Sequence, residues 1–380
     1  KTVEAKVEDA TVKANDILVS ATSENSMGGT KKPDGTYDIL DITSDNYRKV
    51  LLNDKGDGLN QGSAFKNWNM FYDLDFGSKL EASGTVIVKK VNNTVNAYVS
   101  NSKVTANNLA VLADDYSIKN IIAGEIDASL RGSINGTVLI TKDTSTLNAV
   151  IDNNSNIDLR NDLNLRARNK KDNIEVVVGA GGSLNVTAHA NVVTNNSNDT
   201  TTAKIENSTV SANNSVKIDA LNDVKATRVL FTGGGAKNVG INVEPLINSY
   251  TGSTIAKIIN SSINKGAINL KGHDSVTSLD IVAGLAVAGQ GFSGNGIAIK
   301  NMYNNKVFAG IEEGSIIDID KDINIITESI LKGENWTVTV GFTFQGASLA
   351  ADVILNDIKT NINSYIANSE IKKAGNINLS

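Results

Sequence analysis

The stretch Ala203–Val210, AKIENSTV, decides the fold because variants of it return along the chain at a nearly constant interval. The related stretches are AKVEDATV from Ala5, AYVSNSKV from Ala97, AVIDNNSNI from Ala149, AKIINSSI from Ala256, AGIEEGSI from Ala309 and SYIANSEI from Ser364. From Ala97 onward, successive copies begin 52, 54, 53, 53 and 55 residues apart. This recurrence predicts an internal repeat of about 53 residues.

Within one copy the apolar residues alternate with polar ones, as on a strand with one buried face. The apolar set is Ala203, Ile205, Val210, Ala212, Val216, Ile218 and Ala220. The alternation breaks at Asn207-Ser208 and at Asn213-Asn214, where small polar side chains suit tight turns. We therefore predict three short strands joined by two corners. Such a layer can bury its inward face only against layers above and below it, which predicts a solenoid.

The second half of each repeat is richer in glycine and also alternates, as in GAGGSLNVTAHANVV after Val178. We interpret each repeat as two coils of roughly 20 to 30 residues, which gives about 13 coils in the chain. At the ~4.8 Å that separates neighbouring strands, the shaft would be about 60 Å long. The predicted fold class is all-β, a right-handed parallel β-helix with the handedness taken from the family resemblance given below.

Composition excludes several classes of protein. The 380 residues include 32 Gly, 2 Pro and no Cys, so a disulfide framework and a thiolate metal site are excluded. The net charge of −5 gives no case for a nucleic-acid partner. We expect no cofactor and no metal. The chain opens and closes inside a repeat, and we expect it to belong to a longer polypeptide.

One interval between successive copies of the repeat is longer than the others. Ala5 and Ala97 are 92 residues apart, which exceeds the usual 53 by 39. A second landmark agrees, because SGTVIV from Ser83 matches NGTVLI from Asn135, 52 residues later. The extra residues therefore lie between Glu24 and about residue 73. The predicted regions are a first coil at 1–22, an insertion or subdomain at 23–72, and solenoid repeats at 73–380.

The insertion is rich in aromatic residues, and these are candidates for binding. They could pack on the flank of the solenoid, or they could form a recognition surface, since aromatic residues on loops over a rigid scaffold are common contact residues. The candidates are Tyr37, Tyr47, Trp68, Phe71 and Tyr72.

A second candidate surface carries three of the six arginines. Arg160, Arg166 and Arg168 lie with Lys170 and Lys171 in LRNDLNLRARNKK, where the arginines alternate with apolar residues. The three arginines are predicted to share an outward face that could meet an anionic glycan or an acidic protein patch. The alternative is an ordinary mixed surface.

Other motifs are given structural interpretations. The GxGxxG at Gly289–Gly294 is followed by a further strand pattern and not by the helix that a dinucleotide site requires. Ile281–Ile299 has no charge, and we interpret it as a solenoid segment buried on both faces; membrane insertion is not expected. His189 is predicted to face solvent from a strand, and His273 to lie in a corner. Paired acids are interpreted as a solvated face.

The recurrent AxIxNSxI, followed by AxxxIxIxA and a Gly-rich GxGxAxxV-like segment, resembles the passenger regions of large secreted bacterial adhesins of the filamentous-haemagglutinin type. It is most similar to the leukotoxin-like filamentous adhesins of fusobacteria. The resemblance covers residues 1–22 and about 73–380 and carries no catalytic residue. It implies type V or two-partner export, a right-handed parallel β-helix, and a place outside a Gram-negative cell, either secreted or on its surface.

Three functions remain open. The first is an adhesive shaft that presents its outer side chains and the insertion to a host cell-surface protein or glycan, without enzymatic activity. The second is a polysaccharide lyase or hydrolase acting on an acidic glycan, because acids and basic residues of stacked coils can gather along one face. The third is a toxin segment that inserts into membranes.

Overall fold

The computed structural model describes residues 1–27, 30–31, 37–38, 69–77 and 80–380, and the side chains of 1–23 and 84–380. The described residues are all-β, with 89% in strands and no helix; none of them forms a helix that could cross a membrane. The strands are β1 (Thr2–Glu8), β2 (Thr11–Lys13), β3 (Asp16–Met27), β4 (Thr30–Lys31), β5 (Tyr37–Asp38), β6 (Asn69–Gly77), β7 (Leu80–Ser100), β8 (Lys103–Ala106), β9 (Asn108–Ser129), β10 (Gly132–Asp152), β11 (Asn156–Leu159), β12 (Asp162–Ser183), β13 (Val186–Glu206), β14 (Thr209–Ala236), β15 (Val239–Ile259), β16 (Ser262–Glu312), β17 (Ile316–Ile319), β18 (Ile323–Ile366), β19 (Glu370–Lys373) and β20 (Ile377–Leu379).

The copies of the repeat lie directly above one another. Ala97 pairs with Ala5 on one side and with Ala149 on the other. The same column continues through Ala203, Ala256, Ala309 and Ser364. Every ladder in this sheet is parallel, so the predicted parallel β-solenoid of about 53-residue repeats is confirmed.

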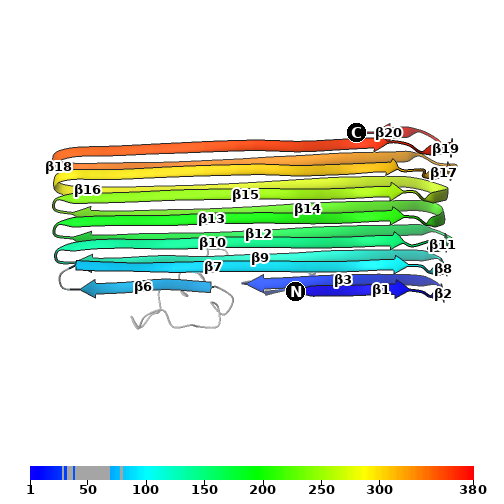
Figure 1. The fold of residues 1–380 in the computed structure, drawn as a ribbon, viewed down its shortest axis with the longest axis horizontal. Coiled ribbons are helices and arrows are strands. Elements are labelled where there is room, and N and C mark those ends of the chain that lie inside the picture. The colour runs from blue at the N-terminus through cyan, green and yellow to red at the C-terminus, as the bar shows by residue number, and fades with distance from the viewer. Residues whose placement is uncertain (28–29, 32–36, 39–68, 78–79) are drawn as a thin grey trace.

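The expectation of two coils per repeat is wrong, because one repeat makes one complete coil. The long strands β10, β12 and β13 run for 21, 22 and 21 residues without turning back. At ~3.3 Å per residue such a strand is about 70 Å long, whereas seven layers at ~4.8 Å rise only about 30 Å. The longest dimension therefore follows the strands and not the stacking axis (Figure 1).

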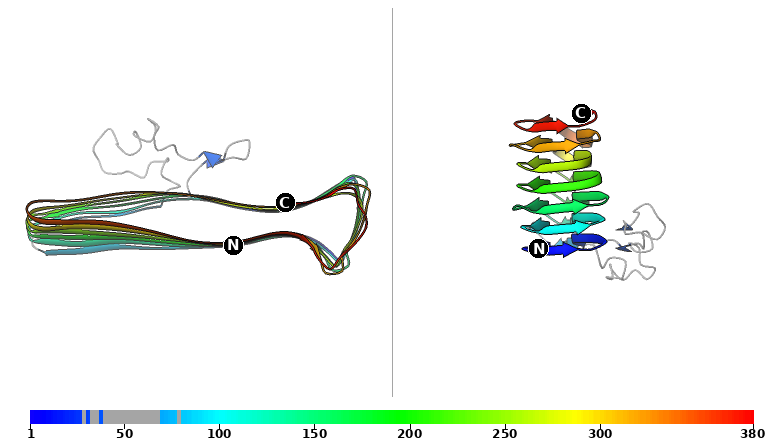
Figure 2. Two further views of the ribbon diagram at one scale, coloured as in Figure 1. Left: turned by 90° about the horizontal axis from the view of Figure 1, so that it is seen from above. Right: turned by 90° about the vertical axis from the view of Figure 1, so that its right-hand side faces the viewer.

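Each coil has a three-sided end, the head, and a flat two-layered part, the blade (Figure 2). We name the front sheet for the strands that run into the head, β7, β10, β13 and β15, and the back sheet for those that leave it, β9, β12 and β14. β16 and β18 contribute to both sheets, because each of them turns at the far end of the blade, the tip. The short strands β2, β8, β11, β17 and β19 form the third side of the head. The coils wind in a right-handed sense (Figures 1 and 2).

The head is held together by a continuous apolar core. Equivalent inward positions carry small or branched apolar side chains in every coil, and Leu165, Ile205 and Ile218 are fully buried. Burying such a side chain contributes about 1.5–3 kcal/mol. Because each layer supplies the same set, the core extends along the whole stack as the repeat predicts.

The insertion leaves the back sheet in the first coil. Met27 pairs with Lys119, and Asn69 pairs with Ile121. Met27 and Asn69 are 42 residues apart, whereas their partners Lys119 and Ile121 are 2 apart. The first coil therefore holds 40 additional residues between Met27 and Asn69. Of them, β4 and β5 form a small antiparallel ladder.

The inward face of the blade was assigned incorrectly near the tip. His189 was expected to face solvent, but it is buried between the two sheets together with Thr187 and Asn191. The apolar residues Leu184 and Val186 of the same segment lie on the outer surface instead. His189 is therefore not a solvent-facing histidine, and burial lowers its pKa although Asp127 acts in the opposite direction.

The uncharged segment Ile281–Ile299 is not buried on both faces, as we had expected. It forms the tip of the fifth coil within β16, and its residues alternate between the interior and the surface. Leu285 and Phe292 are exposed on opposite faces of the blade. Gly289–Gly294 lies in the same turn and continues as a strand, so the interpretation against a dinucleotide site agrees with the structure.

Candidate functional site

The first corner of each coil is formed by the Asn-Ser pair of the repeat. Asn101, Asn207 and Asn260 have positive φ angles of 45°, 47° and 44°, a conformation that asparagine tolerates better than most residues. The following serine is buried, and the backbone N–H of Ser208 donates to the Oγ of Ser261 in the next coil at 3.1 Å. The corner sequence is therefore fixed by backbone geometry and by a ladder of hydroxyl groups.

We expect Asn207→Val to lower the free energy of unfolding by about 1–2 kcal/mol more than Asn207→Gly does. Both variants lose the hydrogen bond that Asn260 Nδ2 donates to Asn207 Oδ1 at 2.7 Å. Only valine adds strain at positive φ, since glycine adopts this conformation freely. Urea denaturation of the two variants measures the difference, and equal stability would contradict the backbone argument.

A polar hollow of about 480 Å³ opens at this corner over the third to fifth coils. Its lining consists of asparagine, serine and threonine residues, and it presents amide and hydroxyl groups that both donate and accept hydrogen bonds. The lining residues are Asn153, Asn154, Ser155, Asn156, Asn207, Ser208, Thr209, Asn260 and Ser262. Such a surface suits a ligand rich in hydroxyl groups.

The second corner places Arg160 in a separate hollow. This hollow has a volume of about 470 Å³, and Arg160 shares it with the corner residues of the two preceding coils, which are Lys13, Ala14, Asn15, Thr105, Ala106 and Asn107. Arg160 is exposed and lies in the turn between β11 and β12. It does not lie on the strand face that was predicted to hold all three arginines.

Arg166 and Arg168 lie together on the outer face of the back sheet, and both contact Asp114 of the preceding coil. Arg166 Nη2 is 2.6 Å from Asp114 Oδ2, and Arg168 Nε is 3.5 Å from Asp114 Oδ1. The guanidinium of Arg168 also lies over the ring of Tyr116, 4.8 Å from its centroid. Because these contacts use part of each guanidinium, the pair is a weaker anion site than two free arginines would be.

The structure leaves the aromatic candidates of the insertion untested. Tyr47 and Trp68 lie outside the described residues. Tyr37 lies in β5, and Phe71 and Tyr72 lie in β6, but the described part of these residues does not include their side chains. Their proposed role as a recognition surface stays a prediction.

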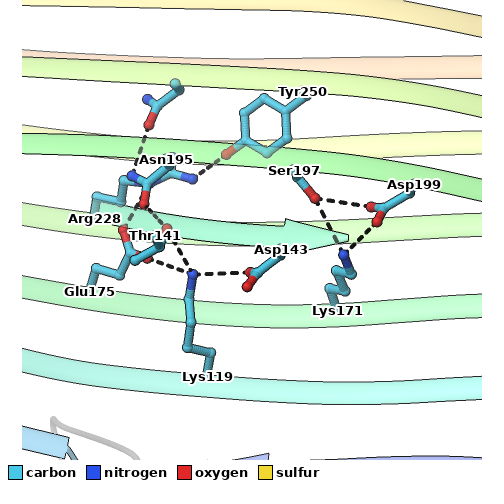
Figure 3. Close-up of polar contacts among 11 residues, drawn as sticks. Lys119, Thr141, Asp143, Lys171, Glu175, Asn195, Ser197, Asp199, Arg228 and Tyr250 are labelled. Atoms are coloured by element: carbon cyan, nitrogen blue, oxygen red, sulfur yellow. Dashed lines mark hydrogen bonds and ion pairs between the residues drawn. The ribbon is translucent and has the colours of Figure 1, made fainter. Parts of the chain in front are cut away.

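A buried ladder of charged residues crosses the middle of the blade, and the sequence analysis missed it (Figure 3). Glu175, Arg228 and Asp280 occupy one register position in three successive coils. Arg228 Nε is 3.3 Å from Glu175 Oε2, and Arg228 Nη1 is 2.9 Å from Asp280 Oδ1. Lys119 Nζ lies 2.8 Å from Glu175 Oε1 and 3.2 Å from Asp143 Oδ2. Opposite charges thus alternate along the stack.

Neutral polar side chains complete this network. Arg228 Nη2 donates to the hydroxyl of Tyr250, and Asn248 Nδ2 donates to Asp280 Oδ2 at 3.1 Å. Asn195 Nδ2 donates to Asn248 Oδ1 at 3.1 Å, and Asn195 Oδ1 accepts from the Thr141 hydroxyl. Each link joins one sheet to the other or one coil to the next. The network therefore helps to fix the register of the long strands, beside a buried apolar cluster of the blade that includes Val177, Leu230 and Leu246.

Two charged groups of this network, Glu175 and Lys119, have pKa values shifted toward the charged form in spite of burial. Burial opposes ionisation of Glu175, but Lys119 and Arg228 outweigh it and lower the pKa of this carboxyl group. Burial likewise disfavours the charged form of Lys119, yet Glu175 and Asp143 raise the pKa of the amine. All of these side chains lie inside the blade. They are placed to stabilise the coil stack and not to meet a substrate.

A second buried lysine forms its own pair nearby. Lys171 Nζ lies 2.5 Å from Asp199 Oδ1, and both side chains are almost fully buried. Lys171 lies next to the arginines in the sequence, but the structure places it inside the blade and separates it from Arg166 and Arg168. A signal for this existed, because the inward alternation of Leu163, Leu165 and Ala167 continues without a break through residues 169, 171, 173 and 175.

The remaining titratable candidates have ordinary structural roles. His273 lies within β16 and not in a corner, and its Nδ1 is 3.0 Å from Glu328 Oε2 in the next coil. Among the described residues, no group of three or more histidine, cysteine or acidic side chains could hold a metal ion.

Comparisons of the chain with protein-family models, curated proteins and solved structures find no match.

Glu244 is a buried acid with a strongly raised pKa. It points inward from β15 and is inaccessible to solvent. Burial raises its pKa from the ordinary 4.5 to about 8; the hydroxyl of Thr232 acts against this shift and the charge of Asp352 adds to it. The folded chain therefore keeps a proton on Glu244 that the unfolded chain releases above pH 4.5.

We expect stability to fall as the pH rises from about 4.5 to about 8, because the folded state binds the extra proton in this range. Glu244→Gln should remove up to about 1.4 kcal/mol of this loss per pH unit. Urea denaturation at several pH values measures the slope for both proteins. Glu370→Gln, at an exposed acid, is the matched control and should leave the slope unchanged. Parallel slopes for the parent and Glu244→Gln would contradict the prediction.

Proposed function

We propose that this chain is a surface-exposed or secreted segment of a large bacterial adhesin or toxin, and that it acts as a rigid scaffold that presents polar surfaces to a host glycan or protein. The observation that carries the proposal is the asparagine- and serine-lined hollow at the first corner. Its side chains stand on a backbone fixed by stacked coils, so little conformational entropy would be lost on binding.

The resemblance to filamentous-haemagglutinin-type adhesins supports the same function through the repeat motif. A stacked solenoid also repeats its corner groups at ~4.8 Å, a spacing that places several donors and acceptors along an extended ligand. A host glycan is the favoured partner for the hollow because amide and hydroxyl groups match sugar hydroxyls. The expected location is outside a Gram-negative cell.

A glycan and host-protein array probed with the intact chain tests the proposal. The double change Asn156→Ala with Thr209→Ala removes two exposed side chains of the hollow without changing the positive-φ residues of the corner. We expect it to weaken glycan binding at least tenfold. The matched control, Asn198→Ala with Thr251→Ala, changes exposed residues of the front sheet and should bind as the parent does.

The contribution of the insertion is tested separately by deleting residues 28–67. This deletion leaves one residue between Met27 and Asn69, as between their partners in the next coil. Loss of binding only in this variant would place the contact surface in the insertion. Turnover of an acidic glycan would instead favour the lyase or hydrolase, and no binding to any array member would count against adhesion.

A further inference from the structure

Large apolar side chains lie exposed on both outer faces of the blade near its tip. On the back sheet these are Ile126, Phe231 and Leu285, and we name them the back patch. On the front sheet they are Ile134, Val186, Ile241 and Phe292, the front patch. Each of the seven is more than one third exposed, although every one lies in an inner coil of the stack with further coils on both sides.

The outer surface around these patches has no charged side chain for several positions on each side of the tip. In the third coil the outward positions from Ile174 to Val192 are all uncharged, and Lys170 and Asp172 mark the boundary on the back sheet. In the fifth coil the uncharged stretch runs from Ile281 to Ile299. The charged residues at the tip of the inner coils lie in the turns themselves, at Arg131 and Lys237.

The interior beneath the patches is polar, which reverses the usual arrangement. Thr187, His189, Asn191 and Asn242 fill the space between the sheets at the tip. The outward apolar residues therefore do not serve the core of this coil stack. Contiguous exposed apolar patches on a folded protein commonly mark a contact with another molecule.

The flatness and size of these faces fit a second copy of the same chain. Five stacked coils at ~4.8 Å and about nine residues at ~3.3 Å give a face of about 24 by 30 Å, or roughly 700 Å². Two such faces in contact would bury about 1,400 Å², which is the standard size of a stable interface. The ring of Phe231 lies over Gly233 and that of Phe292 over Gly294, so these large side chains lie along the sheet and leave a flat face for a facing sheet.

A lipid bilayer fits these faces less well. Arg131 and Lys237 lie in the turns at the tip, and moving such charges into hydrocarbon is costly. A facing β-sheet leaves these turns in water. The interior polar groups also require no lipid contact, since they are already enclosed by the two sheets of the blade.

We propose that copies of this chain associate side by side, blade against blade, with back patch against back patch and front patch against front patch. Because each copy has an apolar patch on both faces, a dimer leaves one patch of each copy uncovered, and further copies add to it. The association is independent of the glycan contact at the head, so either proposal can fail without the other.

Sedimentation velocity over a range of concentrations tests the association. We expect the parent chain to form species larger than a dimer as its concentration increases. The back-patch change Phe231→Asp with Leu285→Asp should limit assembly to dimers, and adding the front-patch change Val186→Asp with Ile241→Asp should give monomers. All four positions are on the outer surface, and circular dichroism checks that the strands are retained.

The matched control is Leu18→Asp with Ile326→Asp, which places the same charges at exposed apolar positions of the back sheet near the head. It should assemble as the parent does. A parent chain that stays monomeric up to several hundred micromolar would overturn the proposal, as would equal disruption by the control. Monomers that float with phosphatidylcholine vesicles would assign the patches to lipid instead. Monomers from the back-patch change alone would overturn the use of both faces.

Discussion

Replacing Arg228 by methionine is expected to lower the free energy of unfolding by about 3–5 kcal/mol. The change leaves Glu175 and Asp280 buried without the cation that lies between them. It also removes the hydrogen bond from the guanidinium to Tyr250. Methionine fills much of the same volume, so the loss reports the unpaired charges more than a cavity. Urea denaturation gives the total, and amide hydrogen exchange should show β14 opening first.

The control for this prediction is Arg160→Met, the same change at an exposed corner, which should cost less than about 1 kcal/mol. A second variant, Asp280→Asn, tests the mechanism through a double-mutant cycle with Arg228→Met. Because the two residues are in contact, their effects should be non-additive by about 1 kcal/mol or more. Additive effects, or a loss at Arg228 no larger than at Arg160, would show that the ladder does not stabilise the blade.

Deleting one whole coil, residues 256–308, should give a shorter chain that still folds. Ala256 pairs with Ala309, so the cut joins equivalent positions and returns every later strand to a partner in the correct register. Arg228 keeps Glu175 as its partner. Stability should fall only by the contribution of one repeat and its interfaces, as in other stacked-repeat proteins. Circular dichroism and cooperative urea unfolding measure the outcome.

Deleting only residues 256–282 should abolish folding of the later coils. This cut removes the part of the fifth coil that runs through the head and along most of the back sheet, but it leaves the part of β16 that belongs to the front sheet. The remaining chain is too short to complete the coil, so the later strands lose their register. The two deletions also distinguish a fold with one coil per repeat from a fold with two coils per repeat. With two coils per repeat, the shorter deletion would remove one complete coil and the rest could still fold. A folded, cooperative protein after the shorter deletion would therefore contradict the structure described above.

The head could be predicted from sequence, and the candidate site only in part. Asn207 and Ser208 predict a corner because such small polar side chains suit tight turns. The hollow at the first corner forms because equivalent corners of successive coils stack on one another. Arg166 and Arg168 were placed correctly on an outer face by alternation. Their shared partner, Asp114, was not foreseen, because it lies 52 residues from Arg166 and 54 from Arg168, and the pairing depends on the register of two coils.

The charged ladder could have been detected by aligning the repeats, since Glu175, Arg228 and Asp280 recur at spacings of 53 and 52 residues. It was missed because burial of charge is unfavourable unless partners are present. Those partners come from the next coil and from the opposite sheet. No stretch of sequence around Arg228 alone contains the information that its charge is compensated.

The sequence by itself determined the parallel solenoid, the length of its repeat, the position of its corners and the apolar core of its head. These features depend on alternation and turn chemistry, which act over a few residues and repeat in every copy. Only the tertiary structure decided that one repeat is one coil, that charged residues are buried within the blade, and that the tip of the blade is polar inside and apolar outside. The physical reason is that alternation distinguishes the two faces of a strand but does not say which face is enclosed. The enclosed face is the one whose side chains find partners on the facing sheet and in the neighbouring coils.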